Sequence, residues 1–554
     1  MANTYQDNTS AEKMRGEYYT PPELIALMLS ELGPTLHDRF VDPSCGEGRF
    51  LCGVARALAA TWPARSDVYQ LVDRLIGFDI DAQAVAAARE HLRQEFLALF
   101  GLDIPLEQFR IFHADALRHT SLTDLWQSLA LPPLAQNERL LVIGNPPYVE
   151  AKRLGREEKQ RLKELYPTAL IGAADLYLYF MHVCLQWLRA QDALAFVLPN
   201  KILVNANARE VRQSLLDGAQ LSGVWFATQA QLFPGTKVYP VVLFARGRGA
   251  ATAIQLQHIE RHGECLHIDE AQTITHDLYG HTEAKAFYPL PHQAGLRLVL
   301  ERMLQRHDLA GRLDDICDIR WCVSFHRSGL REQYVTPTPP ETPNARPFLG
   351  GGAFAGNGEV RRYTIDWAGW WMDYDAPRLC RQGNVVPALK LFTQEKIAIC
   401  QNARTMRAAY DTRGFVLKDT FLGAIVRASA HPLSAHPRAI VGLLNSQLVH
   451  FFYAHLFYGG HVNGGYLHFL NSFLVDIPLG NWSDETARTV EGLVIRREQA
   501  ADPEEQQAIE TDIEGHVQQA FGVSPTEALL LQRWIAEDDN WQARERIRVM
   551  KSEE

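Results

Sequence analysis

Short apolar runs alternate with amphipathic segments along the first 250 residues of the chain. A short apolar run between turn residues is typical of a buried strand, and apolar positions three or four apart are typical of a helix. The alternation predicts an α/β domain with a mainly parallel sheet. The predicted strands are Arg39–Asp42, Leu75–Asp79, Phe109–His113, Leu140–Ile143, Leu194–Leu198, Gly223–Phe226 and Val241–Phe244, and the predicted helices are Pro21–Leu32, Gly48–Ala60, Asp81–Phe96 and Asp175–Leu188.

The first predicted helix has a distinct start. Thr20 stands at the expected N-cap, Pro21 takes the first helical position, and Glu23 lies three residues after the cap. This is the pattern of a capping box, in which the cap and the acid each bond a backbone amide of the other. We therefore predict that Thr20 caps this helix.

The pattern changes after residue 250. Regular alternation weakens, a loop rich in Pro and Thr covers 336–347, and aromatics, glycines and short strands such as Lys396–Ile399 follow. The end of the chain is charged and helical, with a second capping box at Ser524–Glu527. We predict four parts, namely an α/β domain at 1–250, a connector at 251–310, a mixed α+β domain at 311–480 and a helical tail at 481–554.

Composition narrows the class of protein. Hydrophobic residues make up 47% and charged residues 22% of the 554 residues, as in folded globular proteins. No apolar stretch is long enough to span a bilayer, and the polar segment Met1–Ser10 lacks the apolar centre of a signal peptide. We therefore expect a cytoplasmic protein without a membrane partner.

The net charge of −10 does not exclude a nucleic-acid partner, because such a site needs only one basic face. A basic run lies between 381 and 418, where only Glu395 and Asp411 oppose the cations. Within it we predict that Lys396, Arg404 and Arg407 contact DNA; the alternative is a solvated surface. The run contains Arg381, Lys390, Lys396, Arg404, Arg407, Arg413 and Lys418.

The first motif with candidate chemistry is Asp42-Pro43-Ser44-Cys45-Gly46-Glu47-Gly48, at the end of the first predicted strand. Glycines at a strand-to-helix turn let a ligand approach the backbone closely, and the amides of the helix start can then face a carboxylate. The motif indicates a cofactor loop, although a plain tight turn uses the same residues.

Two further acids follow predicted strands. Asp79 ends the second strand, where a carboxylate can accept hydrogen bonds from both ribose hydroxyls of a nucleoside cofactor. The alternative is a helix N-cap, but Asp81 is equally placed for that role. Asp115 follows the third strand and is suited to accept from an adenine amino group; otherwise it is a turn residue.

The most specific motif is Asn145-Pro146-Pro147-Tyr148, after the fourth predicted strand. An aromatic amine is a poor nucleophile because its lone pair is delocalised into the ring. The Asn145 side-chain oxygen and the Pro146 carbonyl can both accept from such an amine and favour a tetrahedral nitrogen. Tyr148 offers a face on which a flat base can stack, worth about 1–3 kcal/mol.

In this order the motifs resemble the gamma group of amino-methyltransferases that act on DNA. That group has a Thr-Pro-Pro element, a Gly-rich cofactor loop, an Asn-Pro-Pro-Tyr motif and a C-terminal target-recognition domain. The resemblance covers residues 15 to about 245 well, although Glu47 stands where the group often has a small residue. The C-terminal half resembles the recognition domains more loosely, through Leu443–Gln447, Phe451–Tyr453 and Phe473–Pro478.

The resemblance implies a Rossmann-like domain that uses S-adenosylmethionine to methylate N6 of an adenine flipped out of double-stranded DNA. It implies no metal, a C-terminal target-recognition domain with a helical tail, and room for a separate restriction or specificity subunit. Phe233 is implied as the second stacking aromatic; the alternative is a core position. The implied cofactor residues are Thr20, Asp42, Pro43, Cys45, Gly46, Gly48, Asp79 and Asp115, and the implied base-site residues are Asn145, Pro146, Tyr148 and Phe233.

Four other functions share parts of this pattern. Asn-Pro-Pro-Tyr also occurs in enzymes that methylate a glutamine of release factors, but these lack a long C-terminal region. An RNA base methyltransferase and an N4-cytosine methyltransferase need the same acceptors, although Ser in place of Asn145 is more typical of the latter. A specificity subunit without catalysis would not need intact acceptor and cofactor motifs.

Overall fold

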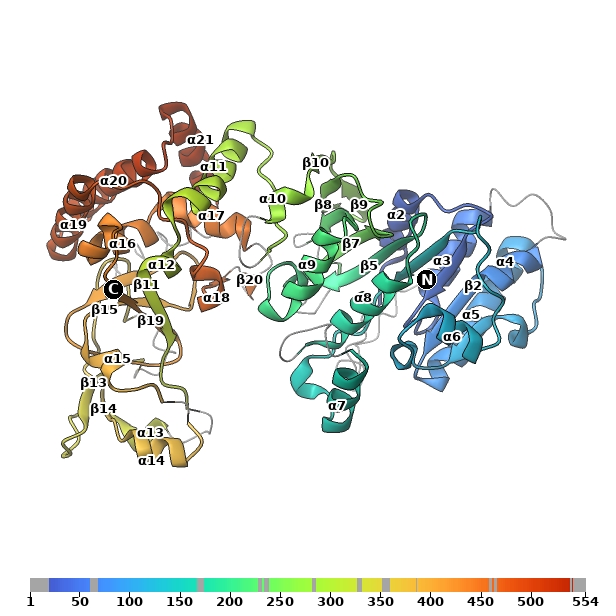
Figure 1. Cartoon of the computed structure of the whole chain (residues 1–554), viewed down its shortest axis with the longest axis horizontal. Coiled ribbons are helices and arrows are strands. Elements are labelled where there is room, and N and C mark those ends of the chain that lie inside the picture. The colour runs from blue at the N-terminus through green and yellow to red at the C-terminus, as the bar shows by residue number, and fades with distance from the viewer. Residues whose placement is uncertain are drawn as a thin grey trace. The chain divides into compact units, whose positions relative to one another are not determined.

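The computed structural model describes residues 19–59, 68–166, 174–227, 232–233, 239–280, 285–325, 331–350, 359–384, 386–457, 461–462, 466–538 and 541. The chain divides into two compact units (Figure 1). The first contains residues 1–280 and 285–289, and the second contains 281–284 and 290–554. The predicted catalytic and cofactor residues therefore lie in the first unit, and Lys396, Arg404 and Arg407 lie in the second.

The first unit consists of alternating strands and helices, as the apolar pattern predicts. Its strands are β1 (Arg39–Asp42), β2 (Leu75–Asp79), β3 (Arg110–His113), β4 (Leu140–Gly144), β5 (Ala193–Pro199), β6 (Leu221–Phe226), β7 (Pro240–Arg246), β8 (Ile254–His262), β9 (Cys265–Ile268) and β10 (Gln272–Ile274). Its α-helices are α2 (Pro22–Leu32), α3 (Arg49–Ala59), α4 (Val68–Arg74), α5 (Ala82–Phe100), α6 (Leu122–Ser128), α7 (Arg156–Leu165), α8 (Leu176–Trp187), α9 (Arg209–Asp217) and α10 (His276–Gly280).

These strands form one sheet in the order β10-β8-β6-β7-β5-β4-β1-β2-β3, with β9 paired to β8. The pairs from β3 to β5 are parallel, whereas β7 runs antiparallel to both β5 and β6. Every residue of β1, β4 and β5 is buried, as expected for parallel strands covered on both faces. The predicted α/β class with a mainly parallel sheet is confirmed.

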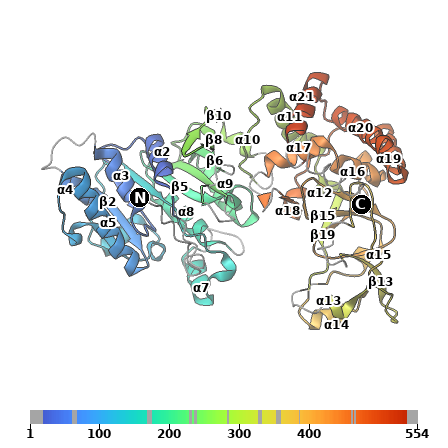
Figure 2. The same cartoon turned by 180° about the vertical axis from the view of Figure 1, so that it is seen from behind.

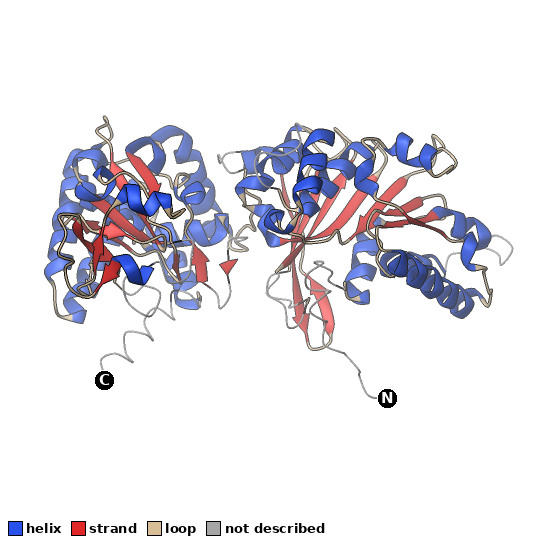
Figure 3. Ribbon diagram, turned by 90° about the horizontal axis from the view of Figure 1, so that it is seen from below, coloured by secondary structure: helices blue, strands red, loops and turns tan. Residues whose placement is uncertain are grey.

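Helices cover both faces of this sheet (Figure 3). On one face, a single core cluster joins apolar side chains of α2, α3, α4 and α5 to those of the strands. The helix α8 is buried on nearly all sides. Within the described residues, no helix is long and apolar enough to cross a membrane.

The strands continue beyond residue 250, where we expected a connector to begin. β8 pairs in parallel with β6, and β10 pairs antiparallel with β8. Only Ile254, Leu256 and Ile259 of β8 are buried, so its last residues break the alternation by which a strand is found in a sequence.

The predicted cap of the first helix is wrong. The helix α2 begins at Pro22, and Pro21 stands at its N-cap with φ −59° and ψ 139°, where it has no side chain to bond an amide. A residue before proline is kept out of the helical region, so the second proline moves the start by one residue. Thr20 then lies outside the helix. The capping box at Ser524 is confirmed at the start of the last helix.

The second unit is a mixed α+β assembly. Its helices are α11 (Ala294–Ala310), α12 (Leu313–Ile316), α13 (Arg331–Tyr334), α14 (Ala376–Arg381), α15 (Lys390–Thr393), α16 (Pro437–Leu444), α17 (Gln447–Leu456), α18 (Asn471–Leu474), α19 (Asp484–Gln499), α20 (Pro503–Ala520) and α21 (Pro525–Glu537). Its strands are β11 (Cys317–Trp321), β12 (Val335–Thr336), β13 (Ala345–Leu349), β14 (Trp371–Asp373), β15 (Lys396–Cys400), β16 (Asn402–Ala403), β17 (Ala408–Asp411), β18 (Val416–Leu417), β19 (Phe421–Val426), β20 (His461–Val462) and β21 (Tyr466–His468).

The described strands of this unit form three small sheets, in the orders β11-β19-β15-β17, β12-β14-β13-β18 and β16-β21-β20. The strands β13 and β14 lie with α13 and α14 at the end of the unit away from α19, α20 and α21 (Figures 1 and 2). Buried ion pairs join distant segments: the Arg362 guanidinium lies 2.6 Å from Glu510 on α20, and Arg497 on α19 lies 2.8 Å from the same carboxylate.

Candidate active site

The predicted motifs meet at the carboxyl edge of the first sheet. The strand order reverses between β1 and β4, and Asp42 and Asn145 stand at or just after the ends of these two neighbouring strands. In open α/β sheets, ligands bind at such a switch point. A cleft of about 940 Å³ lies there. Its lining includes the predicted residues Thr20, Asp42, Pro43, Cys45, Gly46, Asp79, Asp115 and Asn145.

The Gly-rich loop is held open beside the cleft by its own backbone. The Cys45 amide donates to the Phe78 carbonyl of β2 at 2.8 Å, which fixes the loop to the sheet. Gly46 has a φ of +50°, which favours glycine. Gly48 has a φ of +80°, and a Cβ there would lie 3.1 Å from the Cβ of Ala88. Gly48 therefore serves the close packing of α5 and does not line the cleft.

Asp79 links the Gly-rich loop to the end of β2. Its two carboxylate oxygens accept from the amides of Gly46 and Asp81, each at 2.9 Å. Asp81, and not Asp79, caps α5, because its side chain accepts from the Gln83 amide at 2.8 Å. The helix-cap alternative for Asp79 is thereby excluded, and its carboxylate stands on the cleft wall.

Asp42 is a buried acid at the base of the cleft. Its carboxylate accepts from the Ser44 amide at 3.1 Å, and a Cβ at Gly144 would lie only 2.7 Å from it. Burial, and to a smaller extent the nearby Asp79, raise the pKa of Asp42 to about 8, although the Ser44 amide opposes the shift. A carboxyl group held in this state is typical of a functional site.

Asp115 stands across the cleft at the start of a single turn of 3-10 helix, Ala116–Arg118. One oxygen accepts from the Leu117 amide at 2.9 Å, as in an N-cap. The other lies 3.0 Å from the guanidinium of Arg161 on α7. The acid is therefore held from two directions, and its side chain remains partly exposed to the cleft.

The Asn145 side chain is oriented by Thr20, which does not cap α2. Its Nδ2 donates to the Thr20 hydroxyl at 3.2 Å, so its Oδ1 is turned away from Thr20. Thr20 is buried and lines the same cleft. The displaced cap thus gives Thr20 a contact within the predicted base site, a role that the sequence did not reveal.

The two predicted stacking aromatics differ in their surroundings. Tyr148 is half-buried, packs against the core cluster and meets the Tyr177 ring edge-on at 6.2 Å between centroids. Phe233 is 7% exposed and belongs to that cluster. Neither ring, nor Pro146, is among the described residues that line the cleft. The stacking role of both aromatics stays a prediction.

Sequence reasoning missed the apolar wall of the cleft. Ile80 follows Asp79 and is 72% exposed, and Leu117, Leu176 and Phe180 line other parts of the cleft. An isoleucine exposed at a strand end offers a surface for a flat ring. The position of Ile80 directly after Asp79 could have been recognised in the sequence. Leu117, Leu176 and Phe180 could not, because they lie on helical segments that only the fold brings together.

The predicted DNA contacts of the second unit are not alike. Lys396 is fully buried, where its ammonium lies 2.5 Å from the Asp411 carboxylate and 2.8 Å from the Phe392 carbonyl. The prediction that Lys396 contacts DNA is therefore wrong, because β15 is covered on both faces and every one of its residues is buried. Arg404 and Arg407 are half-buried, and the Arg404 guanidinium lies 5.1 Å from the centre of the Tyr466 ring.

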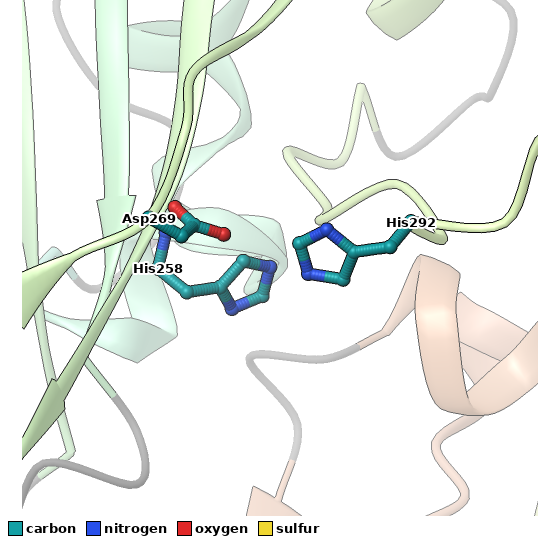
Figure 4. A group of neighbouring side chains, drawn as sticks. All are labelled: His258, Asp269 and His292. Carbon is teal, nitrogen blue, oxygen red and sulfur yellow. Dashed lines mark hydrogen bonds between the residues drawn. The ribbon is translucent and has the colours of Figure 1, made fainter.

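Another polar cluster lies near the edge of the sheet, on β8 (Figure 4). The Asp269 amide donates to the His258 carbonyl, and the His258 amide donates to the Asp269 carboxylate. The His258 ring lies 5.4 Å from that of Phe226. His292, drawn in the same view, belongs to the second unit. These contacts fasten β9 to β8 and do not form part of the cleft.

Two protein families match the sequence. The N-6 DNA methylase family matches residues 4–281, and the TaqI-like C-terminal specificity domain matches residues 353–479. The first match spans about half of the chain and contains the whole cleft. The second falls within the unit that holds Arg404 and Arg407.

Known proteins resemble part of the chain in sequence. The type II methyltransferase M.BanIII of Aneurinibacillus aneurinilyticus is 27% identical over 249 residues, which cover 42% of this chain and 39% of that protein. M.PaeR7I of Pseudomonas aeruginosa is 26% identical over 250 residues, 43% of this chain and 42% of that protein. The chain thus matches about two fifths of the length of these relatives.

Solved structures share the fold over most of the chain. The Type IIL restriction-modification enzyme MmeI in complex with DNA gives a TM-score of 0.55 at 15% identity, covering 94% of this chain and 75% of that one. A nuclease-deletion mutant of the Type ISP enzyme LlaGI with a DNA substrate mimic gives 0.51 at 12% identity, covering 87% and 47%. Together with the matched motifs and their meeting at one cleft, the family match establishes that the chain belongs to the N-6 DNA methylase family.

Proposed function

We propose that the protein is a site-specific DNA methyltransferase that transfers a methyl group from S-adenosylmethionine to N6 of an adenine in duplex DNA. The observation that carries the proposal is the position of Asn145. It stands at the switch point of the sheet, in the same cleft as the Gly46 loop and Asp79. This shared cleft supports an acceptor role for Asn145 beside a site for a nucleoside cofactor.

The charge of the cleft lining supports the proposed cofactor. Six carboxyl groups and one guanidinium belong to its described lining, which suits a ligand with an ammonium and a sulfonium. We propose that Asp79 binds the ribose hydroxyls, that Ile80 packs on one face of the adenine and that Asp115 accepts from its amino group. When bound, S-adenosylmethionine supplies an electrophilic methyl group on positively charged sulfur.

The chain's own contribution is to prepare the target nitrogen. Asn145 Oδ1 and the Pro146 carbonyl accept the two amino hydrogens and draw them from the plane of the base. The nitrogen lone pair then localises and can attack. Thr20 holds the Asn145 amide in the required orientation. The nucleophile belongs to the substrate, so no covalent bond to the chain is required.

The adenine must leave the duplex for this contact, because N6 is inaccessible within the stack. We propose that Tyr148 and Phe233 bind the extruded base, and that the second unit reads the surrounding sequence. The match of residues 353–479 to a specificity domain favours this over a release-factor or RNA substrate. A separate restriction or specificity subunit is compatible with the proposal and not required by it.

Replacing the acceptor tests the proposed function. Asn145→Ala should lower methyl transfer to plasmid DNA by about 100- to 1000-fold, as for loss of a transition-state hydrogen-bond partner. Binding of S-adenosylhomocysteine, measured by calorimetry, should stay within about threefold, since Asn145 faces the base. Asn137→Ala, at an exposed position outside the cleft, is the matched control and should keep wild-type activity. Full activity of Asn145→Ala would overturn the proposal.

A further inference from the structure

One helix fastens the cofactor side of the cleft to the base side. The helix α7 follows the Asn145–Tyr148 motif along the chain, after the short segment 149–155. Two of its neighbouring side chains reach the opposite wall. Arg161 lies on α7, and Tyr166 is its C-cap residue.

Both side chains hold the turn that carries Asp115. The Arg161 guanidinium donates to the Asp115 carboxylate at 3.0 Å and to the Leu117 carbonyl at 3.3 Å. The buried Tyr166 hydroxyl lies 3.0 Å from the Leu117 carbonyl and 3.2 Å from that of His119. The turn is thus held at its acid and along its backbone by residues from the same helix end.

Arg161 is itself fixed, so it can fix another group. Its guanidinium also bonds the Glu158 carboxylate one turn earlier on α7, at 2.9 Å through Nε. This hydrogen bond, and the charge of Asp115, raise the pKa of Arg161 despite its partial burial. A guanidinium held by two carboxylates has little rotational freedom, and its planar fork sets the direction of each carboxylate it bonds.

We propose that Arg161 is a positioning residue that aims the Asp115 carboxylate at the adenine amino group of the cofactor. The inference rests on the proposed function. Arg161 engages one oxygen and the Leu117 amide engages the other, so the carboxylate plane is set before the ligand arrives. An oriented carboxylate distinguishes a 6-amino group, which donates, from a 6-oxo group, which repels it.

The same contact also fastens α7 to the turn that carries Asp115. A role limited to this fastening differs from the positioning role in one measurable way. Loss of a fastener weakens all ligands alike, whereas loss of aim weakens the ligand with the amino group and spares the one without it.

The test measures binding of S-adenosylhomocysteine and of its 6-oxo analogue, S-inosylhomocysteine, to the full chain by calorimetry. The wild type should prefer the amino ligand at least about tenfold, the value of one hydrogen bond to a charged group. In Arg161→Ala this preference should fall to about threefold or less. Arg118→Ala is the matched control and should keep the preference. Arg118 also lies near the same carboxylate, at 3.6 Å, but its side chain is 71% exposed.

Arg161→Lys keeps the charge and the stem and should give an intermediate preference, which preserves the test if the alanine variant does not fold. Equal weakening of both ligands in Arg161→Ala, or an unchanged preference, overturns the positioning role while leaving the proposed function standing. A wild type that binds neither ligand overturns the proposed function instead, and the inference with it. Thermal melting of each variant separates loss of fold from loss of aim.

Discussion

In the first unit, six carboxyl groups and one guanidinium line an open cleft, whereas the cations predicted to be functional in the second unit include one that is buried in an ion pair. Asp42, Asp79 and Asp115 follow strands whose carboxyl ends meet at one edge of a sheet. Lys396 also lies in a strand, but its partner Asp411 faces it from the neighbouring strand β17.

The cleft acids and Lys396 differ in whether the charged group is available to a ligand or is used to stabilise the fold. An acid at the open end of a parallel strand has no partner strand beyond it, so it remains available at the cleft. A cation buried in an antiparallel sheet must find a partner inside the unit, because an unpaired buried charge is costly. The acids at the carboxyl edge of the first sheet are therefore candidates for ligand binding, whereas Lys396 stabilises the fold of the second unit.

Removing the buried cation should give the largest effect on stability. Lys396→Ala leaves Asp411 buried without its counter-ion, so we expect the free energy of unfolding to fall by about 3–5 kcal/mol in urea titrations. Lys390→Ala, at an exposed position just before β15, should change it by less than about 0.5 kcal/mol. A Lys396→Ala protein that is as stable as the wild type but binds DNA weakly would reverse the comparison.

Removing a cleft acid should act on the ligand instead. We expect Asp79→Ala to weaken S-adenosylhomocysteine binding by about 1–3 kcal/mol, because the ribose hydroxyls lose their acceptor. Asp81→Ala removes the cap of α5 and should lower the thermal midpoint, with a smaller change in affinity. Unchanged affinity in Asp79→Ala, measured by calorimetry, would mean that this acid only fastens the Gly46 loop.

The raised pKa of Asp42 should make the stability of the protein depend on pH. This pKa is about 8 in the folded protein and about 3.9 when unfolded, so the folded state holds the proton more tightly. The stability linked to this proton is complete below about pH 4 and is lost as pH rises through 8. Asp42→Asn should remove this loss, so the free energy of unfolding of the variant should not fall between about pH 4 and pH 8 through this group. An unchanged pH profile in urea titrations would show that Asp42 titrates normally.

The smallest effects are expected for Arg404 and Arg407, the two other predicted DNA contacts in the second unit. Exchanging Arg404 and Arg407 for Glu should weaken DNA binding and lower the slope of log affinity against log salt by about one for each phosphate that is no longer neutralised. Arg488→Glu, at an exposed position on α19 paired with Asp484, is the control. If the Arg404→Glu and Arg407→Glu variants bind DNA with the same salt slope as the wild type and the control, neither Arg404 nor Arg407 contacts DNA.

The elements around the cleft could be predicted because they depend on local sequence. Asp42, Asp79 and Asn145 are each adjacent to an apolar run, and the end of a parallel strand fixes where such a residue lies. The Arg161–Asp115 contact could not be predicted, since it joins residues 46 positions apart on elements whose packing only the fold determines.

The errors have the same physical origin. The burial of Lys396 depends on β15 being covered on both faces, and the sequence of one strand does not show its neighbours. The cap at Thr20 depended on a steric effect of Pro22 that overrides the capping pattern.

Single-molecule sequencing of plasmid DNA from cells that express the full chain tests the proposed activity most directly. We predict N6-methyladenine at one defined sequence motif in cells with the wild type, at nearly every copy of that motif, and its absence with Asn145→Ala. Unmodified adenine in both samples, or methylation that persists in Asn145→Ala, would contradict the assignment.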